Sequence, residues 1–234
     1  DAELSIRKAI ELNPHLADAY CHLSELELLN GDYQSGLENY EFRFQVKKPA
    51  VTHGKTKIQK KNNKILQKGE KLLIVSEQGL GDTLQYMRYI PYLKKQGFDI
   101  SFCAQEKLHS LIKASGIEQN PLTSKQSILV SDGQWLPLLS LPRYLEVSPN
   151  NPIITQSYIY STDTLNKKWK NILSKEKKVI VGINWQGSPL MEKNFYQGRS
   201  IPLETFSKLA ENNQIKMLSL QKGFGSEQLD HCSF

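Results

Sequence analysis

Leu72-Leu73-Ile74-Val75-Ser76-Glu77-Gln78-Gly79-Leu80-Gly81-Asp82-Thr83 is the stretch that decides the fold of this 234-residue chain. Its first four residues form a short continuous apolar run, which is typical of a strand buried on both faces of a sheet. A glycine-containing turn follows, and residues 83–96 then have the amphipathic spacing of a helix. The order of strand, turn and helix predicts the first unit of an α/β sheet.

The same order returns further along the chain. Residues 98–103 alternate as a second strand, and residues 105–115 predict a second helix that ends at Gly116. Successive β-α units require a parallel sheet covered by helices. We expect a further short strand at 128–130 and a loop in the proline-rich stretch 136–142, and residues 150–161 favour no element.

The last third of the chain restarts the pattern. It predicts a helix at 165–173, a strand at 179–185, a long polar loop, a helix at 202–211 and a strand at 215–220. Two strands and one helix cannot cover both faces of an open sheet, so we expect this second α/β region to be incomplete. The chain also begins at Asp1 rather than Met, and we expect it to be cut from a longer protein.

The first 46 residues have helical periodicity instead. The turn Asn30-Gly31-Asp32 separates two segments in which apolar residues recur at helical spacing, and this pattern predicts a helical hairpin. The apolar positions are Tyr20, Leu23, Leu26, Leu29, Leu37, Tyr40 and Phe44.

The net charge of +6 comes from one segment. Residues 46–71 hold nine Lys against the single acid Glu70, and a lysine-rich stretch low in aromatics is typical of a solvated linker. We therefore expect no nucleic-acid partner. No apolar run approaches the roughly 18 residues of a membrane span. Three scattered Cys predict neither a disulfide framework nor a metal site and favour a reducing cytoplasm.

The glycine turn is the first candidate site. Open α/β sheets bind ligands at the carboxyl end of their strands, and Gly79 and Gly81 permit a close backbone approach beside a helix N-terminus that offers N–H groups to an anion. Asp82 is a candidate general base. The structural alternative is a capping box, in which Asp82 caps the helix and Gln85 reaches back to it.

The second candidate site is the loop from Gly187 and Ser188 to Arg199 and Ser200. It also lies between a strand and a helix, and the guanidinium of Arg199 has the fork of donors that grips a phosphate. The alternative is a solvated polar loop. Trp185, just before it, is expected in the core.

The helical segment resembles the tetratricopeptide repeat. The resemblance is carried by Pro14, Ala17-Asp18-Ala19-Tyr20, Leu23, Gly31-Asp32-Tyr33 and Tyr40. Two residues depart from the pattern: Ser24 stands where the family usually places Gly, and Arg43 where it usually places Ala. The second departure indicates that the array ends here and that the last helix faces something else.

The remainder resembles bacterial repeat proteins whose C-terminal half is similar to heptosyltransferases and, more distantly, to O-GlcNAc transferase. The matching blocks are Glu77-Gln78-Gly79-Leu80-Gly81-Asp82-Thr83-Leu84-Gln85-Tyr86-Met87-Arg88-Tyr89, Pro137-Leu138-Leu139-Ser140-Leu141-Pro142, Val181-Gly182-Ile183-Asn184-Trp185-Gln186-Gly187-Ser188-Pro189, Arg199-Ser200-Ile201-Pro202 and Ser219-Leu220-Gln221. The family's late acidic and His-bearing segment has no counterpart here.

This resemblance implies a GT-B fold. Its parts would be one and a half repeats (1–46), the lysine-rich linker (47–70), a Rossmann-like domain (71–160), and a linker helix with a truncated second Rossmann-like domain (161–234). It implies inverting sugar transfer from a nucleotide-diphosphate donor, with no cofactor or metal, to a protein or glycan acceptor presented by the repeats.

The same resemblance assigns roles to residues. Asp82 would be catalytic, and Gln78, Gly79, Gly81, Gln85, Gly187, Ser188, Arg199 and Ser200 would bind substrates. The alternative is a non-catalytic scaffold for protein partners, and we expect the piece as given to lack activity.

Overall fold

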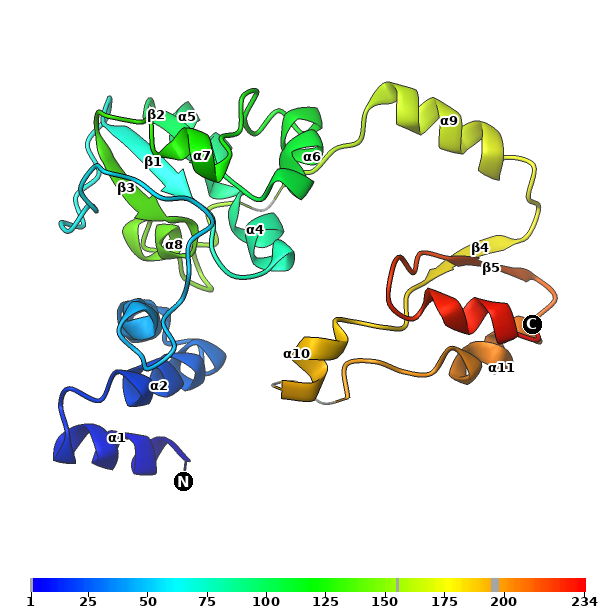
Figure 1. The fold of residues 1–234 in the computed structure, drawn as a ribbon, viewed down its shortest axis with the longest axis horizontal. Helices are drawn as coiled ribbons and strands as arrows, with labels where there is room; N and C mark the ends of the chain where they lie inside the picture. The colour runs from blue at the N-terminus through cyan, green and yellow to red at the C-terminus, as the bar shows by residue number, and fades with distance from the viewer. Residues whose placement is uncertain (1, 155, 195–197) are drawn as a thin grey trace. The chain divides into compact units, whose positions relative to one another are not determined.

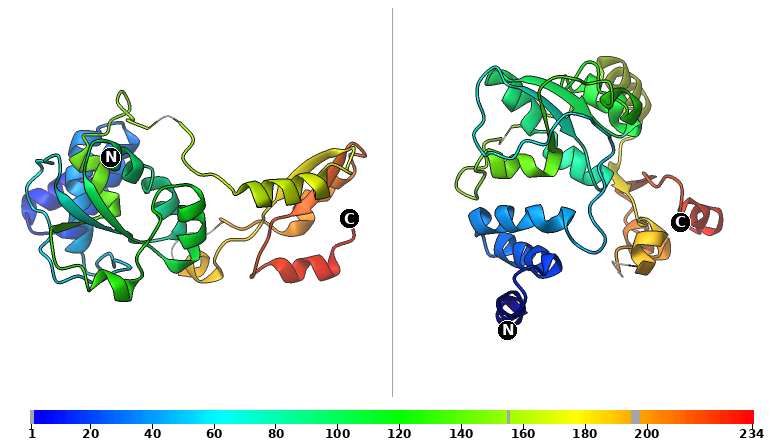
Figure 2. Two further views of the ribbon diagram at one scale, coloured as in Figure 1. Left: turned by 90° about the horizontal axis from the view of Figure 1, so that it is seen from above. Right: turned by 60° about the vertical axis from the view of Figure 1, so that its left-hand side comes forward.

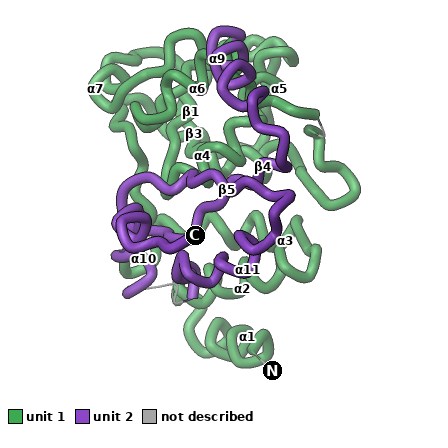
Figure 3. Tube along the Cα trace, turned by 90° about the vertical axis from the view of Figure 1, so that its right-hand side faces the viewer, with its two compact units in different colours: residues 1–162 green, residues 163–234 purple. Residues whose placement is uncertain are grey.

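The computed structural model describes residues 2–154, 156–194 and 198–234 of the chain (Figure 1). The chain divides into two compact units, Asp1–Thr162 and Asp163–Phe234, and Figure 3 colours them separately. Unit 1 combines helices with a three-stranded parallel sheet, and unit 2 holds a parallel pair of strands with short helices. The expected mixed α/β class is therefore confirmed.

Unit 1 begins with helices α1 (Ala2–Leu12), α2 (Ala17–Leu29) and α3 (Tyr33–Asn39), and with the 3-10 helix η1 (Tyr40–Phe44). The predicted helical hairpin is confirmed. Its turn has Gly31 at φ +87°, a conformation that glycine adopts without a steric penalty, and the carboxylate of Asp32 caps α3 by accepting from the Ser35 amide at 3.1 Å. A Cβ on Gly36 would lie 2.7 Å from Leu28 Cγ, so α2 and α3 pack closely at this point.

The sheet of unit 1 consists of β1 (Lys71–Val75), β2 (Asp99–Cys103) and β3 (Gln134–Pro137), in the order β2-β1-β3. Leu72 of the central strand pairs with Ile100 on one side and with Gln134 on the other, both in parallel. Side chains alternate between the faces: Leu72 and Ile74 join the main core, whereas Leu73 and Val75 pack on the opposite face. The strands predicted at 72–75 and 98–103 are confirmed.

Short helices connect and cover these strands. They are α4 (Leu80–Tyr86), α5 (Tyr89–Lys95), η2 (Glu106–Leu108), α6 (His109–Ala114), α7 (Ser124–Ser127), η3 (Leu138–Ser140) and α8 (Leu141–Tyr144). Met87, Ile90 and Ile112 carry the main core from the sheet to these helices. The helix predicted at 83–96 starts earlier than expected and is divided into α4 and α5, and the one predicted at 105–115 is divided into η2 and α6.

The third strand was predicted in the wrong place. The apolar run at 128–130 follows α7 as a turn, and Leu129 is 78% exposed. β3 forms at Gln134–Pro137 instead and includes Leu136 and Pro137, the first two residues of the loop expected at 136–142. Pro137 is its last residue, and β3 is an outer strand of the sheet, where the missing N–H of a proline costs little.

Part of the lysine-rich segment packs against the sheet of unit 1, although seven of its nine lysines are exposed. The Lys61 amide donates to the Trp135 carbonyl at 3.0 Å beside β3. The Lys61 side chain is only 2% exposed and its Nζ lies 2.6 Å from Glu70 Oε1. A Cβ on Gly54 would lie 2.7 Å from Cys103 Sγ, which shows how closely this segment follows the sheet.

Unit 2 contains α9 (Asp163–Leu173), β4 (Val179–Ile183), α10 (Pro189–Asn194), η4 (Leu203–Phe206), α11 (Ser207–Ala210), β5 (Ile215–Ser219) and η5 (Ser226–His231). The helix predicted at 165–173 and both strands are confirmed, and the helix predicted at 202–211 forms as η4 and α11. Trp185 is 2% exposed and packs with Ile183 and Leu203, as expected of a core residue. Across the described residues of both units, no helix has the length and apolar character to cross a membrane.

Candidate functional site

The turn that follows β1 has two buried residues followed by two exposed ones. Ser76 and Glu77 are fully buried, whereas Gln78 and Gly79 are exposed. Gln78 has φ +60°, in the left-handed region that residues with a side chain seldom adopt. Its Nε2 donates to the hydroxyl of Tyr40 at 2.8 Å, so the helical segment contacts the turn directly.

Asp82 caps helix α4, but in a different register from the predicted one. The helix begins at Leu80, Gly79 is its N-cap residue, and Asp82 Oδ2 accepts a hydrogen bond from the Gly79 amide at 2.8 Å. The expectation that Asp82 would be the cap and that Gln85 would reach back to it is therefore wrong. Asp82 remains partly exposed, and a Cβ on Gly81 would meet nothing within 4 Å.

A groove of about 530 Å³ opens beside this turn. Its walls are residues 78–80 after β1, residues 104–107 after β2, His53 from the lysine-rich segment, and Ser124 of α7. The Gln105 side chain connects two of these walls, since its Nε2 donates to the Gly79 carbonyl at 3.3 Å and its Oε1 accepts from the Thr83 hydroxyl at 2.8 Å. The predicted site residues Gln78 and Gly79 thus lie in a groove at the carboxyl edge of the sheet, where open α/β folds bind ligands.

Five polar residues of this groove were missed from the sequence: His53, Gln105, Glu106, Lys107 and Ser124. Gln105 and Lys107 follow β2 directly, so their place after a predicted strand was a usable signal. The ring of His53 lies 3.1 Å from the Ser76 hydroxyl through Nδ1, and its backbone amide donates to the Ser76 carbonyl at 2.8 Å. His53 is 23 positions away in sequence, and only the path of the lysine-rich segment brings it here.

The other side of β1 is closed by the helical segment. The strand order β2-β1-β3 places the point where the strand order reverses between β1 and β3, the usual location of a ligand crevice. Arg43 of η1 fills this point: its Nε donates to Glu77 Oε2 at 3.1 Å and its Nη2 to Glu77 Oε1 at 2.8 Å. Figure 1 and the right-hand view of Figure 2 show the blue helices at the end of the sheet to which the strand arrows point.

The residues around this ion pair complete a buried polar network. Arg43 also donates to the Ser140 hydroxyl at 2.9 Å and to Glu41 Oε1 at 2.9 Å, and the Leu139 amide donates to Glu77 Oε1 at 3.2 Å. Burial disfavours the charged guanidinium, but Glu77 and Glu41 outweigh it and keep the pKa of Arg43 above its ordinary value. The groove beside Gly79 lies on the other side of β1, between β1 and β2.

Gln85 lies apart from the groove. It faces a second pocket of about 350 Å³, lined also by Tyr33 and Leu37 of the helical segment and by Tyr86 and Tyr89. The structure therefore does not place Gln85 with Gln78 and Gly79.

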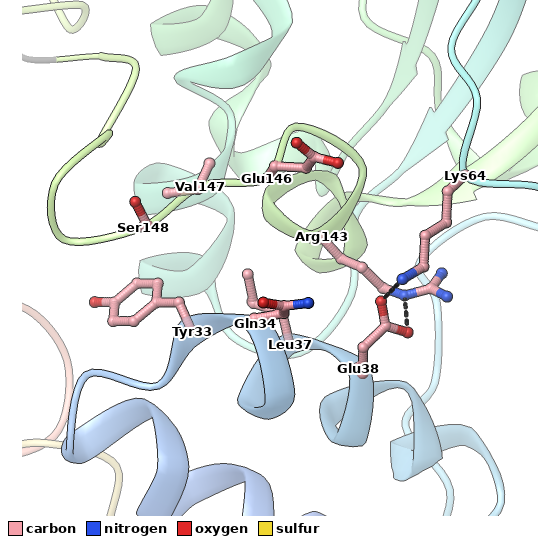
Figure 4. Close-up of a pocket in the computed structure, with 9 residues that line it drawn as sticks. All are labelled: Tyr33, Gln34, Leu37, Glu38, Lys64, Arg143, Glu146, Val147 and Ser148. Carbon is pink, nitrogen blue, oxygen red and sulfur yellow. Dashed lines mark hydrogen bonds and ion pairs between the residues drawn. The ribbon is translucent and has the colours of Figure 1, made fainter.

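A third pocket of about 320 Å³ shares Tyr33 and Leu37 with the second (Figure 4). Arg143 Nε donates to Glu38 Oε2 at 2.8 Å, and Lys64 forms an ion pair with the other oxygen of Glu38 (Figure 4). Both cations of this pocket thus already contact a carboxylate.

The predicted residues of unit 2 form a separate cluster around Glu192. Ser200 donates to the Glu192 carboxylate through its backbone amide at 2.8 Å and through its hydroxyl, and the Gly187 amide donates to Ser200 Oγ at 3.2 Å. The hydrogen bonds from Ser200 and the charge of Arg199 hold the pKa of Glu192 below its ordinary value. Ser188 begins the turn of α10, where its carbonyl accepts from the Glu192 amide at 3.0 Å. Ser200 therefore binds the carboxylate of Glu192.

Among the described residues, no three His, Cys, Asp or Glu side chains are grouped so that they could hold a metal ion. Comparisons with protein-family models, with curated proteins and with solved structures find no match to this chain.

Proposed function

We propose that the chain is the repeat-bearing part of a GT-B glycosyltransferase-like protein that transfers a sugar from a nucleotide-diphosphate donor to an acceptor hydroxyl. The observation that carries the proposal is the groove beside Gly79, with the partly exposed carboxylate of Asp82 hydrogen-bonded to its wall. This groove would receive the acceptor. The helices of residues 2–44 would be tetratricopeptide repeats that present a protein or glycan, and the protein would work in the cytoplasm of a bacterium.

The reaction assigns a role to each cluster. Asp82 would take the proton from the acceptor hydroxyl, whose oxygen attacks the anomeric carbon of the donor sugar. The bond from that carbon to the diphosphate breaks, and its electron pair leaves with the diphosphate. Arg199 would neutralise this leaving group, and Gly187, Ser188 and Ser200 would shape its loop. The hydrogen bond from the Gly79 amide to Oδ2 supports the role of Asp82, since it fixes the direction of the carboxylate.

The competing function is a non-catalytic scaffold for protein partners. Glu192 favours this alternative, because its carboxylate occupies the loop where a diphosphate would bind. A switch-point crevice filled by Arg43 favours it as well.

Ligand-induced stabilisation separates the two functions. A ligand that binds the folded state raises the melting temperature in proportion to the logarithm of its concentration above Kd. If the protein is a transferase, at least one uridine or adenosine diphosphate sugar should raise the melting temperature as its concentration is increased about a hundred-fold. A flat response to the whole panel would leave the scaffold.

A further inference from the structure

We propose that the helical segment sets the shape of the groove, with Tyr40 and Arg43 of η1 acting as positioning residues for the turn Glu77–Gly79. The inference rests on the proposed function only in taking the groove as a binding site. It gives the helical segment a part in forming that site, in addition to presenting an acceptor.

The first contact fixes Glu77. Both oxygens of its fully buried carboxylate accept from Arg43, in the bidentate geometry that adds direction as well as energy to an ion pair. Arg43 is itself held from η1, where its Nη1 donates to the Tyr40 carbonyl at 3.0 Å and to Glu41. The backbone at Glu77 therefore cannot move without breaking contacts to the helical segment.

The second contact fixes Gln78, the next residue. The Tyr40 hydroxyl accepts from Gln78 Nε2 at 2.8 Å, and Gln78 holds the unusual φ of +60°. Gln78 and Gly79 form one wall of the groove. Contacts from η1 thus hold Glu77, just before this wall, and Gln78, its first residue. The left-handed conformation at Gln78 needs such external support.

Other contacts also hold the helical segment in place. Tyr20 stacks on Phe42 with ring centroids 4.1 Å apart, which holds α2 against η1 within the helical segment and away from the turn. The Arg143–Glu38 ion pair connects α8 to α3 independently. The contacts of Tyr40 and Arg43 differ from these because they end on the turn itself.

Amide hydrogen exchange in Tyr40→Phe tests this inference. The variant keeps the ring and removes only the hydroxyl that accepts from Gln78. We expect exchange at the Gly79 amide to accelerate about three- to tenfold, which is the effect of losing one hydrogen bond. Exchange at Ile100 and Phe102 in β2 should stay unchanged. Arg43→Lys, which retains the charge but not the bidentate fork, should accelerate the same amide. Tyr20→Phe is the matched control and should leave Gly79 unchanged.

Unchanged exchange at Gly79 in both variants would overturn the inference, and so would equal acceleration at Gly79 and in β2, since that pattern reports global destabilisation. The consumption of uridine diphosphate sugar is measured on the same variants made in the longer protein proposed above, because the piece as given is expected to lack activity. If the wild-type protein consumes none, the proposed function fails, while the exchange data still decide the positioning role. If it does, Tyr40→Phe should lower the rate and Tyr20→Phe should not.

Discussion

Arg43 and Glu77, 34 positions apart in sequence, form a bidentate ion pair in which the guanidinium side chain is 5% exposed and the carboxylate is fully buried. The pair connects the last turn of the helical segment to the second residue after the central strand. It occupies the point where the strand order changes direction, so the two parts of unit 1 share one polar core. This relationship explains why residue 43 is a large cation rather than the small residue that the repeat pattern leads one to expect.

Removing one partner of this pair should destabilise unit 1 strongly. Arg43→Ala leaves the Glu77 carboxylate buried without its cation, and breaking such a pair costs about 3–5 kcal/mol of unfolding free energy. Urea denaturation measures the change. Lys8→Ala is the control, because Lys8 and Glu11 form an exposed pair whose loss should be too small to resolve beside it. Equal midpoints for Arg43→Ala and the wild-type protein would contradict the buried pair.

The network also predicts an acid-sensitive step. Burial alone would raise the pKa of the Glu41 carboxyl, but Arg43, the Ser140 hydroxyl and Lys60 outweigh it and hold that pKa below its ordinary value of 4.5. A lowered pKa contributes stability that is present above the ordinary value and is lost as the pH falls through the folded one. Glu41→Gln should therefore lose less stability than the wild-type protein below about pH 4.5 in urea titrations.

Glu25→Gln, at an exposed position on α2, is the control and should keep the wild-type pH profile. If Glu41→Gln kept that profile as well, the carboxylate would not stabilise the fold through its charge.

Two glycines should respond oppositely to alanine. At Gly36 the new methyl group would meet Leu28 and force α2 and α3 apart, so Gly36→Ala should cost about 1–3 kcal/mol. At Gly81, inside α4 and with open space around it, alanine should be neutral or stabilise by up to about 1 kcal/mol. Thermal unfolding of both variants checks the pair. Destabilisation by Gly81→Ala would mean that the turn needs this glycine for its own conformation.

Glu192 should weaken anion binding by the loop of unit 2. Its carboxylate accepts from Ser200, where a diphosphate would need donors. Glu192→Gln removes the charge and should tighten the binding of inorganic pyrophosphate several-fold in calorimetric titration. Glu204→Gln, an exposed carboxylate on η4, is the control. If Glu192→Gln bound pyrophosphate no better than the control, Glu192 would not compete with the anion.

Most elements predicted from local pattern were found, with the run at 128–130 as an exception, whereas those set by distant contacts were missed. The apolar run at 72–75 needs no partner to be recognised as a buried strand. By contrast, β3 contains Pro137, which a local rule assigns to a loop, and only its place at the outside of the sheet makes the proline acceptable. The run at 128–130 has the right composition for a strand, but Leu129 points to solvent.

The candidate site divides in the same way. The glycine turn and Gly79 could be found because strand, turn and helix are adjacent in sequence. The register of the cap could not be predicted. The Asp82 carboxylate accepts from the Gly79 amide, three residues before it, rather than from the Gln85 amide, three residues after it. His53 and Arg43 reach this edge of the sheet from segments that no local pattern connects to it, although the departure at Arg43 did indicate an unusual contact.

The most direct test of the central claim is the release of nucleoside diphosphate from a nucleotide sugar by the intact parent protein and by its Asp82→Asn variant. Asparagine can still accept from the Gly79 amide, so the cap and the fold should persist while the general base is lost. The account predicts release by the wild-type protein and a decrease of about 10²-fold or more in the variant, with an unchanged melting temperature. Equal rates in the two proteins would contradict it.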